Sequence, residues 1–139
     1  MKYFAIFFLL WSGCFGGSAG WAEEAPSDDA YRATVGSDGV QHVSMLGGNY
    51  FFRPKRILVK ANVPVELEVS LEQGMIPHTL VITAPEAGIA VDEKLSTEIK
   101  KIRFTPTAVG KYPMYCRNKL LFFESHRQKG MEGMLEVAL

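Results

Sequence analysis

The feature that most constrains the fold is a period-two alternation of apolar and charged residues in the middle of the chain. Between Val63 and Val69 every second residue is aliphatic, and Glu66 and Glu68 occupy alternate positions. Successive side chains on a strand point to opposite faces, so the segment predicts a strand with one buried face and one solvated face.

Short runs rich in β-branched and aromatic residues recur from Val40 onward. Glycine and proline separate these runs, and no segment shows a helical period of useful length. The pattern predicts an all-β domain, a sandwich or a barrel. About eight strands are expected, at residues 40–46, 50–52, 56–60, 63–69, 78–83, 98–105, 111–115 and 132–138.

The first 22 residues have the composition of a secretory signal peptide. Lys2 gives a positive start, Tyr3 to Trp11 is an unbroken apolar run, and small residues lead to Ala22. The run is shorter than the roughly 20 apolar residues that a membrane span needs. We therefore expect cleavage after Ala22 and a periplasmic or secreted protein. The alternative is a lipoprotein that is attached to a membrane only through an acylated Cys14.

Residues 23–38 are rich in acidic and small residues and predict a flexible lead-in, which leaves 39–139 as one domain. Lys2 is the only charged residue of the predicted signal peptide, so the mature chain would carry 14 basic and 15 acidic side chains. This nearly neutral balance argues against nucleic acid as a partner. The mature chain would keep a single cysteine, Cys116, and cannot form an internal disulfide.

A thiol, an imidazole and a thioether lie close together in the last third of the chain, at Cys116, His126 and Met131. Thiolate and thioether are soft ligands, and a Cys-His₂ site with a weak axial Met is the ligand set of copper electron-transfer centres. The segment supplies three of these four ligands, so a second histidine must come from elsewhere in the chain.

Strand parity indicates which candidate ligands face the core. His78, Cys116 and Met131 each share parity with apolar residues of their own strands, so all three should point inward. His42 is predicted to be a surface histidine. Met75 is predicted to be a loop methionine without an assigned task, although its proximity to His78 could let it line a metal pocket.

The residues around these ligands resemble the cupredoxin family of blue copper proteins, over about residues 40–139. The similar segments are the histidine loop at 75–81, the strand at 110–116 that ends in the cysteine, and the segment 126–137. The resemblance implies a Greek-key β-sandwich that holds one type 1-like copper ion. The copper ligands that it implies are His78, Cys116, His126 and Met131.

The resemblance also implies a monomeric one-electron carrier that cycles between Cu(I) and Cu(II) and exchanges electrons with redox proteins. We do not expect an enzyme, because three histidines are too few for further copper sites. Two alternatives remain open. One is a protein that delivers copper to an exported or membrane cuproenzyme, and the other is a β-sandwich interaction module without metal.

The spacing between Cys116 and His126 departs from the family pattern. Nine residues separate them, more than in the commoner family members. The loop can still return His126 to Cys116, because the entropy cost of closure grows slowly with loop length. The insertion also brings Glu124 near the site, which leaves an oxygen ligand as an open alternative.

The inserted loop contains four consecutive apolar residues, 120–123. The preferred interpretation is a short buried turn that plugs the end of the sandwich. The alternative is an exposed patch around His126 on which a redox partner docks. Basic residues flank this segment and could steer an acidic partner: Arg117, Lys119, Arg127 and Lys129.

Overall fold

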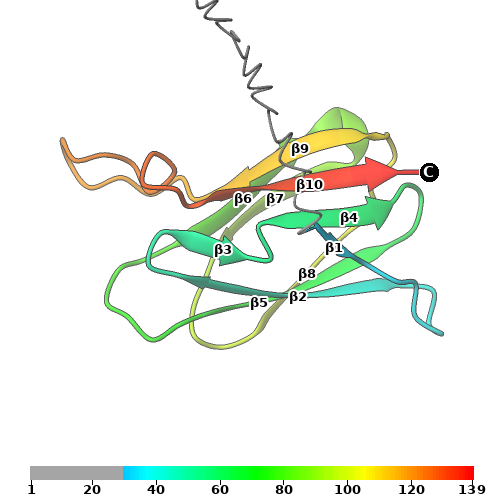
Figure 1. Ribbon diagram of the computed structural model, residues 1–139, viewed down its shortest axis with the longest axis horizontal. Helices are drawn as coiled ribbons and strands as arrows, with labels where there is room; N and C mark the ends of the chain where they lie inside the picture. Colours follow the sequence, from blue (N-terminus) through cyan, green and yellow to red (C-terminus); the bar gives the residue numbers. More distant parts are fainter. Residues whose placement is uncertain (1–29) are drawn as a thin grey trace, which may run out of the picture.

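The computed structural model describes residues 30–139, which form two β-sheets packed face to face (Figure 1). The predicted signal peptide, including Cys14, lies outside the described residues. The six-stranded sheet contains, in spatial order, β1 (Ala30–Arg32), β4 (Arg56–Lys60), β10 (Glu132–Ala138), β9 (Gly110–Tyr115), β6 (Thr79–Ala84) and β7 (Ile89–Lys94). The four-stranded sheet contains β3 (Phe51–Arg53), β2 (Gln41–Gly48), β5 (Val65–Leu71) and β8 (Lys100–Phe104).

Both sheets are mixed. β4 pairs in parallel with β1 and β10, and β2 pairs in parallel with β5, whereas the other neighbours are antiparallel. A short 3₁₀ helix, Pro85–Ala87, joins β6 to β7. The described part of the chain contains no helix with the length and apolar character that a membrane-spanning segment requires.

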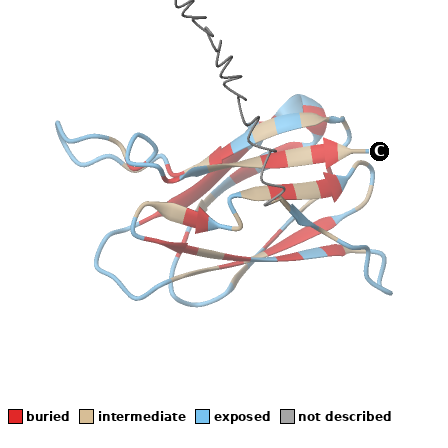
Figure 2. Cartoon of the chain, in the orientation of Figure 1, coloured by how far each residue is buried: buried red, intermediate tan, exposed pale blue. Residues whose placement is uncertain are grey.

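The core lies between the two sheets, where aliphatic side chains from both inner faces meet. Figure 2 marks the buried residues of the strands in red. Leu67 and Val69 of β5 and Leu80, Ile82 and Leu135 of the facing sheet are completely buried. These are the inward positions that strand parity predicts for these segments. The predicted all-β sandwich is therefore confirmed.

Two strands were not predicted. β1 lies inside the segment 23–38 that was expected to be a flexible lead-in, and its residues Ala30–Arg32 pair with residues 56–58 of β4. β7 was missed because Asp92 and Glu93 interrupt its apolar pattern. Both strands lie at edges of the six-stranded sheet. β1 is stabilised by its backbone pairing with β4, whereas β7 also buries Ile89 and Val91 in the core.

The prediction that Glu66 faces solvent is wrong. Only 1% of its side chain is exposed, although it belongs to the alternating segment. β5 lies between β2 and β8, and the Nζ of Lys101 on β8 is 3.0 Å from one carboxylate oxygen, while Arg103 donates a hydrogen bond to the other. Hydrogen bonds from Lys101 and Arg103 lower the pKa of Glu66. The two long cationic side chains thus cover the carboxylate and keep it ionised.

The side chain of His42 is exposed, as predicted, and lies between acidic residues. Its Nε2 is 2.8 Å from Asp38 and its Nδ1 is 3.5 Å from Glu66. The hydrogen bond with Asp38 raises the pKa of His42 above 6.5, and the charges of Asp38, Glu66 and Glu68 act in the same direction.

This raised pKa predicts a pH-dependent contribution of His42 to stability. A group whose pKa is higher in the folded state stabilises the protein below its unfolded pKa, and that contribution is lost as pH rises through the folded value. We therefore expect the difference in urea midpoint between wild type and His42→Gln to shrink as pH is raised from about 6 to about 9. Urea unfolding of the copper-free proteins measures this difference, and a constant difference across the range would contradict the assignment.

Candidate metal centre

Three of the four predicted ligands meet at one end of the sandwich. The Nδ1 atoms of His78 and His126 are 3.1 Å apart. The Sγ of Cys116 lies 3.5 Å from Nδ1 of His126 and 4.0 Å from Nδ1 of His78. All three residues are buried, and in residues 30–139 they form the one group of His, Cys, Asp and Glu ligands compatible with a metal ion.

The spacing of these three atoms suits a single small ion. Imidazole nitrogen and thiolate sulfur bind ions such as zinc at about 2.0–2.3 Å, which places ligand atoms roughly 3.3–3.6 Å apart at tetrahedral angles. The observed separations of 3.1–4.0 Å bracket that range. A thiolate with two imidazoles is a donor set that suits copper. The residues therefore fit one copper ion without rearrangement of the backbone.

The pairing of β6 with β9 brings His78 to Cys116. The two strands are antiparallel, with Val81 opposite Tyr115, so the start of β6 lies beside the end of β9. His78 immediately precedes β6, and Cys116 immediately follows β9. The two ligands are therefore adjacent although they lie far apart in the sequence.

Backbone hydrogen bonds close the long loop and place His126. The N–H of His126 donates to the carbonyl of Asn118 at 2.9 Å, and the N–H of Met131 donates to the carbonyl of His126 at 3.0 Å. The N–H of Cys116 in turn donates to the carbonyl of Met131 at 3.0 Å. The insertion thus leaves and re-enters the site at neighbouring points, as the closure argument predicts.

Met131 is held beside the site by its backbone. Its side chain is completely buried, and its methyl carbon lies 3.6 Å from the point that a Cβ on Gly47 would occupy. The side chain therefore extends toward β2, and its task as an axial ligand stays a prediction. Glu124, in contrast, is exposed and does not belong to the ligand group of the described residues, so the structure gives no support to an oxygen ligand at that position.

Two polar residues beside the sulfur were not predicted from the sequence. The N–H of Thr79 donates to the Sγ of Cys116 at 3.3 Å, and the Thr79 hydroxyl lies 3.6 Å from the same atom. That hydroxyl donates to Oδ1 of Asn118 at 2.9 Å, and Nδ2 of Asn118 donates to the carbonyl of Pro77 at 3.0 Å. Only their positions in the sequence could have identified these two residues, because Thr79 directly follows the predicted ligand His78 and Asn118 lies two residues after Cys116.

Tyr50 packs against both imidazoles. Its ring meets the rings of His78 and His126 nearly edge-on, with centroids 6.2 Å and 5.0 Å apart. The Nζ of Lys129 lies 4.7 Å from the centre of the Tyr50 ring on the solvent side. Tyr50 therefore limits rotation of the two histidine rings.

The surroundings of the two histidines favour their neutral form. Burial lowers the pKa of His78, and the neighbouring His126 lowers it further. Burial also lowers the pKa of His126, with an additional effect from the charge of Lys129. Neutral imidazole is the form that binds metal, so the site favours the state that a copper ion requires.

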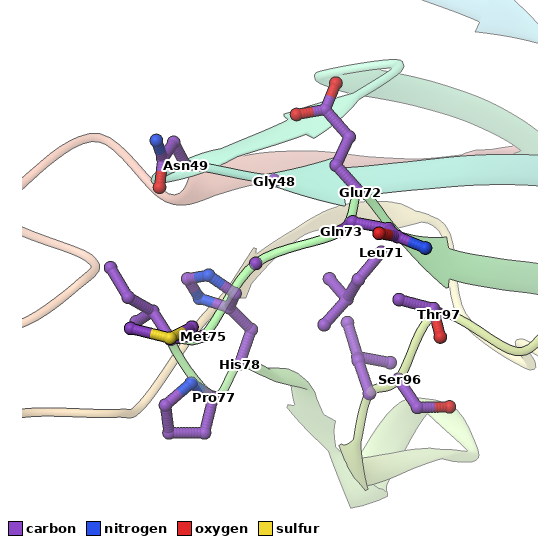
Figure 3. A pocket seen from close by; sticks show the side chains of 13 residues that line it. Gly48, Asn49, Leu71, Glu72, Gln73, Met75, Pro77, His78, Ser96 and Thr97 are labelled. Carbon is purple, nitrogen blue, oxygen red and sulfur yellow. The ribbon is translucent and has the colours of Figure 1, made fainter.

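Cavities lie on two sides of the site. A cavity of about 460 Å³ beside His78 has walls of mixed character, to which Glu72 and Thr97 contribute polar side chains (Figure 3). A second cavity, of about 540 Å³, borders His126 and has mainly apolar walls. Met75 lines both cavities and is 99% exposed, so it lies at their mouths rather than inside a closed pocket.

The prediction of a buried plug at residues 120–123 is wrong. All four side chains are exposed, and Phe122 reaches 90% exposure. The loop that carries them extends beyond the ends of the strands, and within residues 30–139 these side chains stay exposed (Figure 2). The flanking cations are also partly neutralised, since Arg117 pairs with Asp92 at 2.9 Å and Arg127 with Glu132 at 2.9 Å.

Replacement of Thr79 with valine should lower the reduction potential of bound copper. The Thr79 hydroxyl lies 3.6 Å from the sulfur, and on formation of the thiolate its hydrogen could turn from Oδ1 of Asn118 to the sulfur. Valine cannot supply that hydrogen bond, so the thiolate would donate more strongly to Cu(II). One hydrogen bond, about 1 kcal/mol, corresponds to roughly 40 mV for a single electron. Voltammetry measures the shift. Thr83→Val, the same change at an exposed position of β6, is the control, and equal potentials for both variants would contradict the role of the Thr79 hydroxyl.

Comparison with known proteins identifies the fold. No family model matches the chain, and no curated protein matches it. Among solved structures, the metal-binding domain of the Cu(I)-exporting P-type ATPase CopA of Streptococcus pneumoniae D39 is 21% identical, with a TM-score of 0.57 over 79% of this chain and 96% of that domain. Auracyanin A, a blue copper protein of Chloroflexus aurantiacus, is 16% identical, with a TM-score of 0.53 over 72% of this chain and all of the other. This chain has the cupredoxin fold.

The similar structures belong to proteins of different kinds. A chain of a heme-copper terminal oxidase dimer is 12% identical, with a TM-score of 0.56 over 82% of this chain and 76% of that chain. These identities are all low. The fold and the ligand cluster together indicate a copper protein, whereas the particular task within that class depends on the site and its surface.

Proposed function

We propose that this protein is an exported, monomeric copper protein that carries one electron at a time between larger redox proteins. The observation that supports the proposal is the buried triangle of His78, Cys116 and His126. Its ligand atoms already have the spacing that one ion requires, so a change of oxidation state would call for little movement. A preorganised site of this kind suits rapid electron exchange rather than substrate chemistry.

Each residue of the centre has a distinct task in this proposal. Bound copper would supply the one-electron couple. Cys116 and the two histidines hold the ion, the Thr79 N–H donates to the sulfur at 3.3 Å, and Tyr50 restrains both imidazoles. The burial of all three ligands keeps water away from the ion.

The mainly apolar cavity next to His126 is one side from which the site can be approached. Ile76, Pro77, Leu120 and Phe123 contribute to its walls. A redox partner with a complementary apolar surface could approach His126 there, and the electron would pass through the imidazole. Arg117 and Arg127 already have acidic partners, so we expect steering by charge to be weak.

A second candidate function is delivery of Cu(I) to an exported or membrane cuproenzyme. The observation in its favour is Met75, a fully exposed thioether that lines the same cavity as His126. A soft ligand at the mouth of the site could pass Cu(I) inward or outward. The similarity to a metal-binding domain of a Cu(I)-exporting ATPase is consistent with this task.

Voltammetry combined with a chelator competition distinguishes the two functions. An electron carrier should give a reversible one-electron wave and should retain Cu(I) in the presence of a Cu(I) chelator. A delivery protein should lack the reversible wave and should release Cu(I) quickly to the chelator. Metal analysis of the exported protein tests the remaining alternative, a metal-free interaction module, which would contain no stoichiometric copper.

Replacement of Met131 with leucine should preserve the colour of the copper protein and raise its reduction potential. The axial thioether is a weak ligand, so its loss should leave the thiolate-to-copper bond intact while removing a donor that tunes the couple. Absorption spectroscopy and voltammetry measure the two effects. Met134→Leu, the same change on β10, is the matched control, and an equal response of both variants would remove Met131 from the ligand set.

A further inference from the structure

We propose that the tip of the β9–β10 loop inserts into the surface of an anionic phospholipid membrane. Figure 1 shows this loop as the orange segment that projects beyond the ends of the strands, at the opposite end of the sandwich from the C-terminus. Two features of the loop carry the proposal, namely an apolar tip and a basic cavity at its base. Neither feature depends on bound copper.

The apolar tip consists of Leu121 and Phe122. Their exposed fractions are 71% and 90%, and neither residue lines the apolar cavity next to His126. The turn beneath them is closed by a hydrogen bond from the N–H of Phe123 to the carbonyl of Leu120 at 3.0 Å. Leu121 has a φ of +46°, an uncommon backbone conformation for a bulky apolar residue. The chain therefore presents two large apolar side chains to solvent at this turn of the loop.

The basic cavity lies where the loop begins. It has a volume of about 510 Å³, and its lining includes Lys94, Arg117 and Lys119 but no acidic residue. Arg117 also pairs with Asp92, whereas Lys119 makes no ion pair within the described residues. Thr79 and Asn118 also line the cavity, but the Thr79 hydroxyl donates to Asn118 and the Asn118 amide donates to the carbonyl of Pro77. The cavity thus offers mainly the cationic groups of its lysine and arginine side chains to a phosphate oxygen.

The arrangement of the two features matches the layers of a bilayer surface. An inserted apolar element reaches the boundary between headgroups and acyl chains, while basic residues behind it meet the anionic headgroups. Lys119 is next to the apolar segment in sequence and lines the basic cavity, so it connects the two features.

The composition of the tip favours lipid over a protein partner. Protein interfaces concentrate their binding energy in Trp, Tyr and Arg that fill pockets, and leucine is under-represented among such residues. The tip instead presents Leu121 and Phe122 on a projecting turn, which suits insertion between lipid headgroups. If the protein carries electrons as proposed above, insertion would hold the copper centre close to the membrane and to redox proteins embedded in it.

Vesicle sedimentation tests the proposal. The probes are vesicles of phosphatidylcholine alone and vesicles that also contain phosphatidylglycerol, and the samples come from expression of the full chain. We expect the wild type to sediment with the anionic vesicles. The double variant Leu121→Ser/Phe122→Ser should bind at least about tenfold more weakly, and Lys119→Glu should weaken binding roughly tenfold.

Matched variants identify the contribution of the loop. Ile99→Ser removes an apolar residue with 66% exposure from a different loop and should bind like the wild type. All samples carry the same N-terminal segment, so differences among them report the loop alone. The substituted tip residues are exposed, and unchanged thermal unfolding would show that the fold is intact.

Three results would overturn the proposal. The first is that the wild type and the double variant bind the anionic vesicles equally, and the second is that the wild type binds anionic and neutral vesicles equally. The third is that the double variant no longer binds a purified acidic redox protein but still binds vesicles as the wild type does. The last result would assign the tip to a protein partner. The copper spectrum of the same samples reports the proposed electron-carrier function separately, because the tip variants leave all four predicted ligands in place.

Discussion

Replacement of Cys116 with serine is expected to abolish the intense visible absorption of the copper-loaded protein. That absorption arises from charge transfer between thiolate and copper, and a serine hydroxyl supplies neither the soft sulfur nor a readily formed anion. Cys116 is completely buried, and its Sγ lies 3.5 Å and 4.0 Å from the two imidazole nitrogens, so the substitution removes the one thiolate of the predicted centre. Copper affinity should fall by at least about 100-fold, because the loss of outer-shell partners alone costs 10–100-fold.

A titration with Cu(II), followed by absorption spectroscopy, measures both effects. His42→Gln is the control, since it removes an exposed histidine on β2 and should leave colour and affinity unchanged. A Cys116→Ser variant that keeps the visible band would show that the thiol does not bind copper.

Replacement of Gly133 with alanine is expected to destabilise the protein by about 1–3 kcal/mol through overpacking. An added Cβ would overlap the backbone carbonyl oxygen of Lys55 and lie 2.5 Å from the methyl carbon of Met114. The same carbonyl accepts a hydrogen bond from the N–H of Met134 at 2.9 Å, so it cannot move without loss of that bond.

Urea unfolding of the copper-free protein measures the destabilisation. Gly74→Ala is the matched control, because a Cβ at that position would meet nothing within 4 Å. Its stability should stay within about 0.5 kcal/mol of the wild type or increase slightly. If both alanine variants were equally stable, the close approach of the Lys55 carbonyl to Gly133 would not restrict the side chain at that position.

The sequence was informative where local patterns decide the structure. Period-two alternation located most strands, and the predicted bounds of β4 and β10 agree with the structure at both ends. Parity placed His78 and Cys116 on the inner side, and the structure brings them together. These predictions succeeded because an alternating strand exposes its inward residues to the facing sheet regardless of the topology.

Other features depend on contacts between distant segments and have no local signal. β1 forms because its backbone pairs with β4, and Glu66 is buried because Lys101 and Arg103 arrive from β8. The apolar run at 120–123 seemed suited to a buried plug, yet the loop that carries it extends away from the strands. Thr79 contacts the sulfur only because β6 lies beside β9.

X-ray absorption at the copper edge of the reconstituted protein would show whether His78, Cys116 and His126 bind the ion. The account predicts one copper ion per chain, with one short bond to sulfur and two bonds to imidazole nitrogen, in both oxidation states. Copper surrounded by oxygen and nitrogen alone, or distributed over several weak sites, would contradict a centre built from His78, Cys116 and His126.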